Sequence, residues 1–161
     1  MTAKVLLLII LSLTGWKNQR DIDKASKYAD IIIKHSAAFN IDPLLIVAVI
    51  QKESGFREII KGKADERGLM QIKPKSSASK GYDIYGKKAL YDPDLNIYLG
   101  ARHLARAKVE CGTDVMGYYL SFYNGFRQKN GHCYKTSYSE KVMIEYRKLR
   151  RIRDGVNIAK Y

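Results

Sequence analysis

Residues 42–55 read DPLLIVAVIQKESG and predict a short, buried helix that ends at a carboxylate. Asp42 is a good N-cap, and Pro43 fits the first helical position, where no amide hydrogen is needed. Residues 44–50 are all apolar, so this helix is expected to be buried on every side and not amphipathic. Gly55 offers a C-terminal stop.

Glu53 is the candidate catalytic residue of this helix. It follows Leu45 and Val49 at spacings of four, so its side chain is expected on the same face as core residues. Apolar surroundings disfavour the charged form of a carboxyl group and raise its pKa, which lets the group hold a proton near neutral pH. Glu53 is therefore a candidate general acid, whereas a solvated glutamate at a helix end is the ordinary alternative.

Helix signals recur along the rest of the chain. Asp92-Pro93 begins a helix with apolar residues at helical spacing and Gly112 as its stop. Ser137 opens a capping-box pattern before a last, basic helix. No strong strand alternation is found, so any sheet is expected to be small and to lie within residues 61–91. With 161 residues, the chain is expected to form one α+β domain that is predominantly α.

Two motifs follow Glu53-Ser54 in order: Gly-Leu-Met-Gln at 68–71 and Tyr-Asn-Gly at 123–125. Together the three resemble the catalytic domain of the soluble lytic transglycosylases, lysozyme-like enzymes that cleave the glycan strand of peptidoglycan. The resemblance covers about residues 25–150. It implies a single lysozyme-like domain of the kind found in goose-type lysozymes and lytic transglycosylases.

The resemblance implies a peptidoglycan lytic transglycosylase with one catalytic carboxylate, Glu53. Glu53 would protonate the glycosidic oxygen between N-acetylmuramic acid and N-acetylglucosamine. It would then take the proton of the muramoyl C6 hydroxyl, which leaves an anhydromuramoyl end. Tyr123 is implied as a second catalytic residue that orients Glu53. The family needs no metal and no diffusible cofactor.

Five further residues match positions that bind or border the sugar in that family. Met70 is expected to supply an adaptable apolar floor, and the Gln71 amide to address an N-acetyl or hydroxyl group. Ser54 would hydrogen-bond Glu53 or the sugar, Asn124 would line a subsite, and Tyr138 would border the cleft. Ser54 has an alternative explanation as a polar helix terminus, the 68–71 run as a buried turn, and Tyr138 as a hydrophobic cap on the last helix.

Asn96 and Gly100 also match positions of that family. Both lie in the helix that begins at Asp92-Pro93. They are interpreted as packing residues without a part in the chemistry.

The segment before Gly68 departs from the family. Residues 61–67 read KGKADER, where many relatives carry small residues. A carboxylate there, Asp65 or Glu66, could hold a water on the far face of the sugar, as in an inverting hydrolase. A goose-type-like muramidase that hydrolyses the same bond is therefore the enzymatic alternative, and a solvated charged loop explains both residues without chemistry.

An apolar run at residues 5–13 follows Lys4. The run is too short to span a membrane and fits the apolar part of a secretory signal. We therefore expect residues 1–15 to be a signal peptide or a short membrane anchor. Residues 16–161 would then be a lysozyme-like domain with a basic C-terminal helix, exported to the periplasm or cell envelope. An apolar helix docked on the core is the alternative.

Cys111 and Cys133 agree with an oxidising compartment. They bracket the 123–125 motif, so a disulfide between them would restrain one wall of the cleft, and two separate buried thiols are the alternative. The three histidines lack ligand spacing with either cysteine, which leaves a metal site without support.

Basic residues dominate the charge: 29 Lys and Arg against 16 Asp and Glu give a net charge of +13. Such a field favours polyanions. The expected partners are peptidoglycan strands, with an envelope-spanning secretion or conjugation machine and an anionic membrane surface as further candidates. A basic module that binds glycan or nucleic acid is the non-enzymatic alternative, although no nucleic-acid-binding motif is found.

Overall fold

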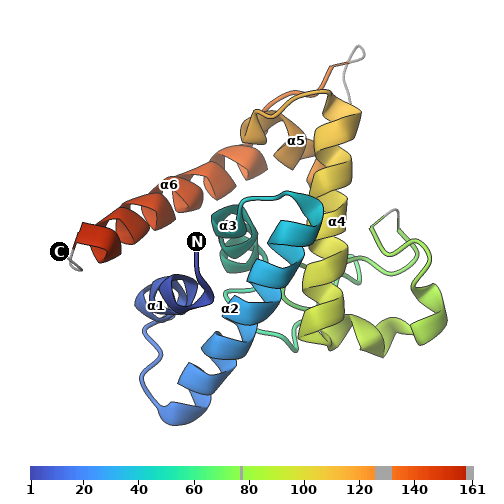
Figure 1. Ribbon diagram of the computed structural model, residues 1–161. Coiled ribbons are helices and arrows are strands. Elements are labelled where there is room, and N and C mark those ends of the chain that lie inside the picture. Colours follow the sequence, from blue (N-terminus) through green and yellow to red (C-terminus); the bar gives the residue numbers. More distant parts are fainter. Residues whose placement is uncertain (77, 126–131, 159–161) are drawn as a thin grey trace.

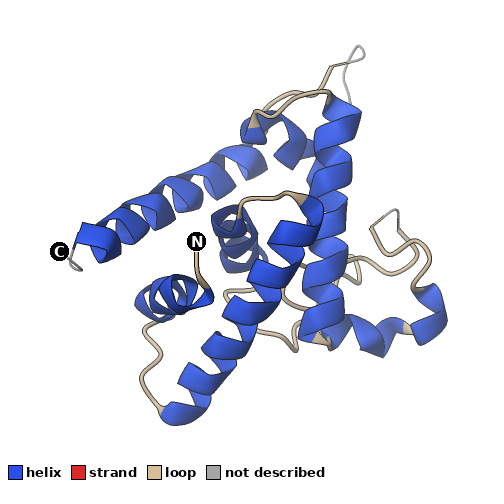
Figure 2. Ribbon diagram, viewed as in Figure 1, coloured by secondary structure: helices blue, strands red, loops and turns tan. Residues whose placement is uncertain are grey.

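The computed structural model describes residues 1–76, 78–125 and 132–158 (Figure 1). Its helices are α1 (Ala3–Thr14), α2 (Gln19–Phe39), α3 (Pro43–Glu53), η1 (Asp83–Tyr85), η2 (Lys87–Tyr91), α4 (Pro93–Cys111), α5 (Met116–Tyr123) and α6 (Ser137–Ile158). Figure 2 shows helices and loops but no strand in this part of the chain. Two isolated bridges, Lys61–Arg67 and Arg67–Ile72, lie within the region expected to hold any sheet. The predicted, predominantly helical domain is confirmed.

α3 lies at the centre of the fold, with α2, α4 and α6 packed around it (Figure 1). The Asp42 side chain accepts a hydrogen bond from the Leu44 amide at 2.8 Å, and Pro43 occupies the first turn. Residues 44–50 are all fully buried. Tyr146 of α6 donates a hydrogen bond to Asp42 at 2.6 Å and ties the last helix to this cap. The apolar residues of α3 are thus buried on every side of the helix, as expected from the sequence. Glu53 is the last residue of α3.

α1 contains the apolar run near the N-terminus. It begins at the N-cap Thr2, ends at Gly15 and packs against α2 and α6. Leu6, Ile9 and Ile10 are fully buried, so the run contributes to the core in this structure. No helix in the described ranges is long and apolar enough to cross a membrane. The assignment of residues 1–15 to a signal peptide or anchor stays a prediction.

α2 is a long amphipathic helix in a region for which no helix was predicted. Asn18 caps it by accepting a hydrogen bond from the Asp21 amide at 2.9 Å, and Asn40 ends it in the left-handed conformation. Its buried face, which includes Tyr28 and Ile32, covers α3 and α4. The helix therefore forms the outer support of the wall that presents Glu53.

A disulfide joins Cys111, the last residue of α4, to Cys133, with the two Cα atoms 5.6 Å apart. It fastens the end of α4 to the segment that leads into α6. The loop that it closes contains α5 and Asn124. The disulfide therefore limits how far the end of α4 and the start of α6 can separate.

Replacing both cysteines with serine is expected to lower the free energy of unfolding by about 3 kcal/mol, since the bridge closes a loop and restricts the unfolded chain. Urea denaturation of the double variant beside the oxidised parent measures this loss. The reduced parent is the matched control and is expected to match the variant. A midpoint equal to that of the oxidised parent would contradict a stabilising role.

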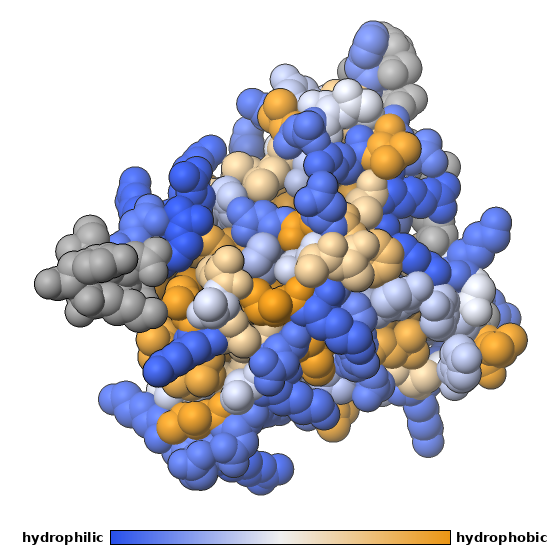
Figure 3. All heavy atoms as spheres, viewed as in Figure 1, coloured by the Kyte–Doolittle hydropathy of each residue, from blue (hydrophilic) through white to orange (hydrophobic). Residues whose placement is uncertain are grey.

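The surface reflects the basic composition. Figure 3 shows hydrophilic side chains around most of the viewed face, with hydrophobic atoms gathered mainly across its middle. Exposed apolar side chains such as Ile59 and Val109 lie far apart in the sequence. Single exposed apolar residues of this kind are ordinary on a folded domain and need no partner.

Candidate active site

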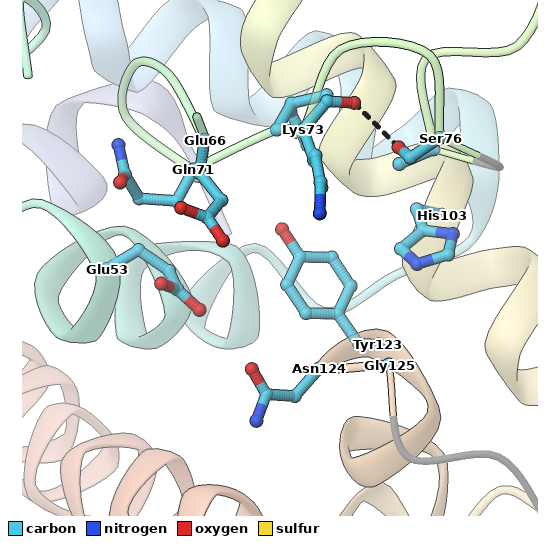
Figure 4. Close-up of a pocket in the computed structure, with 11 residues that line it drawn as sticks. Glu53, Glu66, Gln71, Lys73, Ser76, His103, Tyr123, Asn124 and Gly125 are labelled. Carbon is cyan, nitrogen blue, oxygen red and sulfur yellow. Dashed lines mark hydrogen bonds between the residues drawn. The ribbon is translucent and has the colours of Figure 1, made fainter. Parts of the chain in front are cut away.

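A cavity of about 400 Å³ lies beside the C-terminal end of α3 (Figure 4). Its walls come from the end of α3, the irregular segment that follows, the middle of α4 and the end of α5. The residues that line it are Glu53, Glu66, Gln71, Ile72, Lys73, Ser76, Ala78, His103, Tyr123, Asn124 and Gly125. All three sequence motifs therefore contribute to one cavity, although about seventy residues separate the first from the last.

Glu53 has the environment of a general acid. Burial raises the pKa of the Glu53 carboxyl group above its ordinary value, and the negative charge of Glu66 acts in the same direction. A hydrogen bond from the Tyr138 hydroxyl and the charge of Lys52 oppose this rise without cancelling it. The raised pKa keeps a larger share of Glu53 protonated at a given pH, which acid catalysis requires.

The tyrosine that contacts Glu53 is not the one predicted. The hydroxyl group of Tyr138, at the start of α6, donates a hydrogen bond to Glu53 Oε1, with the two oxygens 2.5 Å apart. Tyr123, expected to orient Glu53, instead donates to the main-chain oxygen of Met70 at 2.9 Å. The Tyr123 ring packs against His103 and lines the cavity. Thus Tyr138 holds the carboxylate, and Tyr123 fastens the cavity wall to α5.

The Gly68–Gln71 motif is shaped by two left-handed residues. Gly68 has φ 76°, and a Cβ there would lie 2.4 Å from the Leu90 carbonyl oxygen, so only glycine fits. Gln71 has φ 49°, and the amide nitrogen of its side chain donates a hydrogen bond to the Gly68 carbonyl oxygen at 2.9 Å. This geometry places the Gln71 side chain at the cavity, as the sequence predicts for a cleft residue.

Met70 does not form the cavity floor that was expected. Its side chain is fully buried and packs against Gly100, where a Cβ would lie 2.2 Å from the Met70 sulfur. A glycine in α4 is therefore what lets Met70 enter the core. The main chain of Met70, which accepts the hydrogen bond of Tyr123, is the part that shapes the site.

Ser54 also differs from its predicted role. It is buried, and its hydroxyl donates to the Ile50 carbonyl at 3.1 Å, so it acts as a polar end to α3. Asn124, in contrast, is exposed at the cavity as expected for a subsite residue. Tyr138 borders the site through Glu53, although it is not itself a lining residue.

Asp65 and Glu66 separate in the structure. Asp65 lies in an ion cluster with Lys87 at 2.8 Å, Arg67 at 2.7 Å and Lys61 at 3.3 Å. The hydrogen bond from Lys87 and the other two cations lower the pKa of Asp65 to about 2. Asp65 thus anchors the loop and does not line the cavity, whereas Glu66 lines it.

Asn96 organises the cavity from beneath. Its side chain is fully buried and accepts a hydrogen bond from the Met70 amide at 2.7 Å. It also donates to the carbonyl oxygens of Arg67 at 2.8 Å and Leu90 at 2.6 Å. These contacts confirm the packing role predicted for Asn96, and those of Gly100 with Met70 do so for Gly100.

Three polar lining residues were not predicted: Lys73, Ser76 and His103. Lys73 and Ser76 lie just after Gln71 in the sequence, and this proximity to the motif is the only feature that could have indicated them. His103 faces the cavity from α4, seven residues after Asn96, and helical spacing from Asn96 could have suggested it. The described residues contain no cluster of His, Cys, Asp and Glu that could hold a metal ion.

Comparison with known proteins identifies a family for this chain. A family model described as the transglycosylase SLT domain matches residues 30–143. An endo-type membrane-bound lytic murein transglycosylase A of Klebsiella pneumoniae is 30% identical over 125 residues, which cover 65% of this chain and 60% of that protein. A membrane-bound lytic murein transglycosylase E of Buchnera aphidicola is 31% identical over 127 residues, covering 65% of this chain and 58% of that protein.

A viral relative is also found. A transglycosylase of Enterobacteria phage PRD1 is 35% identical over 108 residues, covering 67% of this chain and 38% of that protein. The chain thus spans less than two thirds of the length of each of these three relatives.

Proposed function

Because the chain belongs to the transglycosylase SLT domain family, we propose that it is a lytic transglycosylase that cleaves the glycan strand of peptidoglycan. The observation that carries the proposal is that the carboxyl group of Glu53 lies at the wall of a cavity and has its pKa raised mainly by burial. The names of the relatives, which are lytic murein transglycosylases, support the same substrate.

The proposed reaction uses Glu53 twice. Protonated Glu53 gives its proton to the glycosidic oxygen as the bond from that oxygen to the anomeric carbon of N-acetylmuramic acid breaks. The Glu53 carboxylate then takes the proton of the C6 hydroxyl while that oxygen bonds to the anomeric carbon. The products are a free N-acetylglucosamine hydroxyl and an anhydromuramoyl end, and Glu53 is protonated again. The acetamido group of the substrate assists at the anomeric carbon, so a second protein carboxylate is not needed.

Tyr138 is proposed as the residue that positions Glu53, and Tyr138→Phe tests it. The variant keeps the aromatic ring and loses the hydrogen bond from the Tyr138 hydroxyl to the Glu53 carboxylate. Loss of a hydrogen bond to a charged group is expected to lower kcat about tenfold. The bond also lowers the pKa of Glu53, so its loss should raise that pKa and move the alkaline limb of the pH–rate profile to higher pH. Tyr118→Phe, an exposed change on α5, is the control. An unmoved alkaline limb would show that the bond has no effect on Glu53.

Hydrolysis of the same bond is the second candidate, and one observation favours it. Glu66 lines the same cavity as Glu53, and its charge reaches Glu53. A carboxylate on the far side of the sugar could activate water, which would make the enzyme a muramidase. Asp65, the other residue considered for this role, is held by three cations outside the cavity.

Digestion of purified sacculi in heavy-oxygen water separates the two reactions. Transglycosylation takes no oxygen from water, so the muropeptides should carry unlabelled anhydromuramoyl ends. Hydrolysis adds one labelled oxygen to each reducing end. Labelled ends that disappear in Glu66→Gln would establish the muramidase and end the transglycosylase proposal.

We also propose a cellular setting for this chain. The relatives named as membrane-bound favour a place in the cell envelope for this chain too. Export directed by residues 1–15 and contact with a secretion machine or an anionic membrane remain proposals. The net charge of +13 is compatible with adhesion to the anionic wall.

A further inference from the structure

Lys73 is the one lysine or arginine among the described residues that line the cavity. Its side chain is exposed. Figure 4 shows it extending into the cavity, with Glu53 and Glu66 on one side and His103 on the other. A single positive charge therefore faces the place where the proposed substrate would bind.

The charge of Lys73 is not taken up within the described part of the chain. No carboxylate there forms an ion pair with it, although Glu53 and Glu66 line the same cavity. The neighbouring loop behaves differently, because Asp65 gathers Lys61, Arg67 and Lys87 around itself. Lys73 thus keeps its charge available to a ligand.

The main chain that carries Lys73 is held in place. The Ser76 hydroxyl donates to the Lys73 carbonyl oxygen at 2.6 Å. Further along the same wall, Arg102 of α4 donates to the carbonyl oxygens of Ala78 and Lys80, each at 2.9 Å. The Arg102 guanidinium also stacks over the Tyr82 ring at 5.0 Å. This anchoring fixes the wall from which Lys73 extends.

We infer that Lys73 binds a carboxylate carried by the lactyl substituent of the muramic residue at the cleavage site, and the inference rests on the proposed function. The sugar rings and acetamido groups of the glycan are neutral, so its negative charge lies on that substituent. In the intact wall the charge belongs to the peptide stem, and after removal of the stem it belongs to the lactyl group itself. A cavity of about 400 Å³ is at the small end for ligand sites, so the stem is expected to extend beyond it, and Lys73 both lines the cavity and is exposed.

Calorimetric binding to the Glu53→Gln protein tests this without cleavage. Three ligands are compared: glycan strands with stems, strands stripped of stems by an amidase, and neutral chitooligosaccharide. Lys73→Met is added to this background, with Lys73→Arg as the charge-conserving variant. Lys80→Met is the matched control, because Lys80 is exposed on the same segment but does not line the cavity.

Lys73→Met is expected to weaken binding of stem-bearing strands about three- to fivefold, the size of an exposed ion pair, and to leave chitooligosaccharide binding unchanged. Lys73→Arg should retain the affinity, and added salt should reduce the difference. Loss for stem-bearing strands alone assigns the carboxylate to the stem, loss for stripped strands alone assigns it to the free lactyl group, and loss for both shows that Lys73 accepts either carboxylate.

Two results would overturn the inference. Unchanged binding of all three ligands would show that Lys73 does not contact the substrate. Equal loss with chitooligosaccharide would show that it contacts the sugar and not a carboxylate. Failure of the proposed function would be seen separately, as a lack of anhydromuramoyl products from the unsubstituted protein.

Discussion

Glu53→Gln is expected to lower the rate of muropeptide release from sacculi by about a thousandfold, since it removes the only group assigned to both proton transfers. The carboxyl group is replaced by an amide of the same shape that cannot give up a proton to the glycosidic oxygen. Glu110→Gln, at an exposed glutamate near the end of α4, is the control and should keep the parental rate. Retention of a tenth or more of the activity by Glu53→Gln would remove Glu53 from the mechanism.

The same variant is expected to fold at least as well as the parent. The amide oxygen of glutamine can still accept the hydrogen bond of Tyr138. Burial raises the pKa of Glu53 in the folded state, so the parent loses stability as pH rises through that pKa and the group ionises. Glutamine does not ionise. Above this pH the melting temperature of Glu53→Gln should therefore equal or exceed that of the parent. A lower melting temperature would show that the lost activity is a folding defect.

The raised pKa also sets the pH dependence of the parent. An acid catalyst must be protonated, so the activity is expected to fall as pH rises through the pKa of Glu53. The pH dependence of kcat/KM, which reports pKa values of the free enzyme, measures this fall in activity. An activity that rises steadily with pH would contradict a role for Glu53 as the acid.

Asn96→Ala is expected to lower the free energy of unfolding by about 3–5 kcal/mol. The change leaves the Met70 amide and the Leu90 carbonyl oxygen buried without their partner, and it removes one of the two hydrogen bonds to the Arg67 carbonyl oxygen, which keeps that of the Ile72 amide. Each such loss costs about 1–3 kcal/mol, and the effects on one network are not additive. Urea denaturation measures the loss.

Asn124→Ala is the matched control for this change, because Asn124 is exposed and should contribute little to stability. The activity of Asn96→Ala should also fall, since Met70 holds the Tyr123 hydroxyl and the cavity wall moves with it. A loss under about 1 kcal/mol would mean that water or a shifted main chain replaces the Asn96 contacts.

Helix positions followed from local signals where the signals were strong. Asp42-Pro43 and Asp92-Pro93 begin α3 and α4, and Gly112 ends α4 in the left-handed conformation. At α6 the cap is Thr136 and not Ser137, because Thr136 exchanges hydrogen bonds with Ser139. Neighbouring serine and threonine residues offer equivalent caps, and the sequence does not choose between them.

α2 was missed because its sequence is largely polar. Its single buried face carries Tyr28, Ile32 and His35 among charged neighbours. Such a helix is stable only when it packs against α1 and α4. The sequence of the segment alone does not show these contacts.

The cavity residues were predictable only in part. The motifs indicated Glu53, Gln71 and Asn124, which the structure places at one cavity. The direction of each side chain depends on contacts between distant segments. Met70 turns into the core because Gly100 leaves room for it, and Tyr138 reaches Glu53 because α6 packs on α3.

We propose that one glutamate, Glu53, is responsible for the formation of anhydromuramoyl ends. The most direct test is mass spectrometry of the muropeptides that the parent and Glu53→Gln release from purified sacculi, side by side. We expect anhydromuramoyl products from the parent and none above background from the folded variant. Reducing muramic acid ends from the parent, or anhydromuramoyl ends from the variant at a comparable rate, would contradict it.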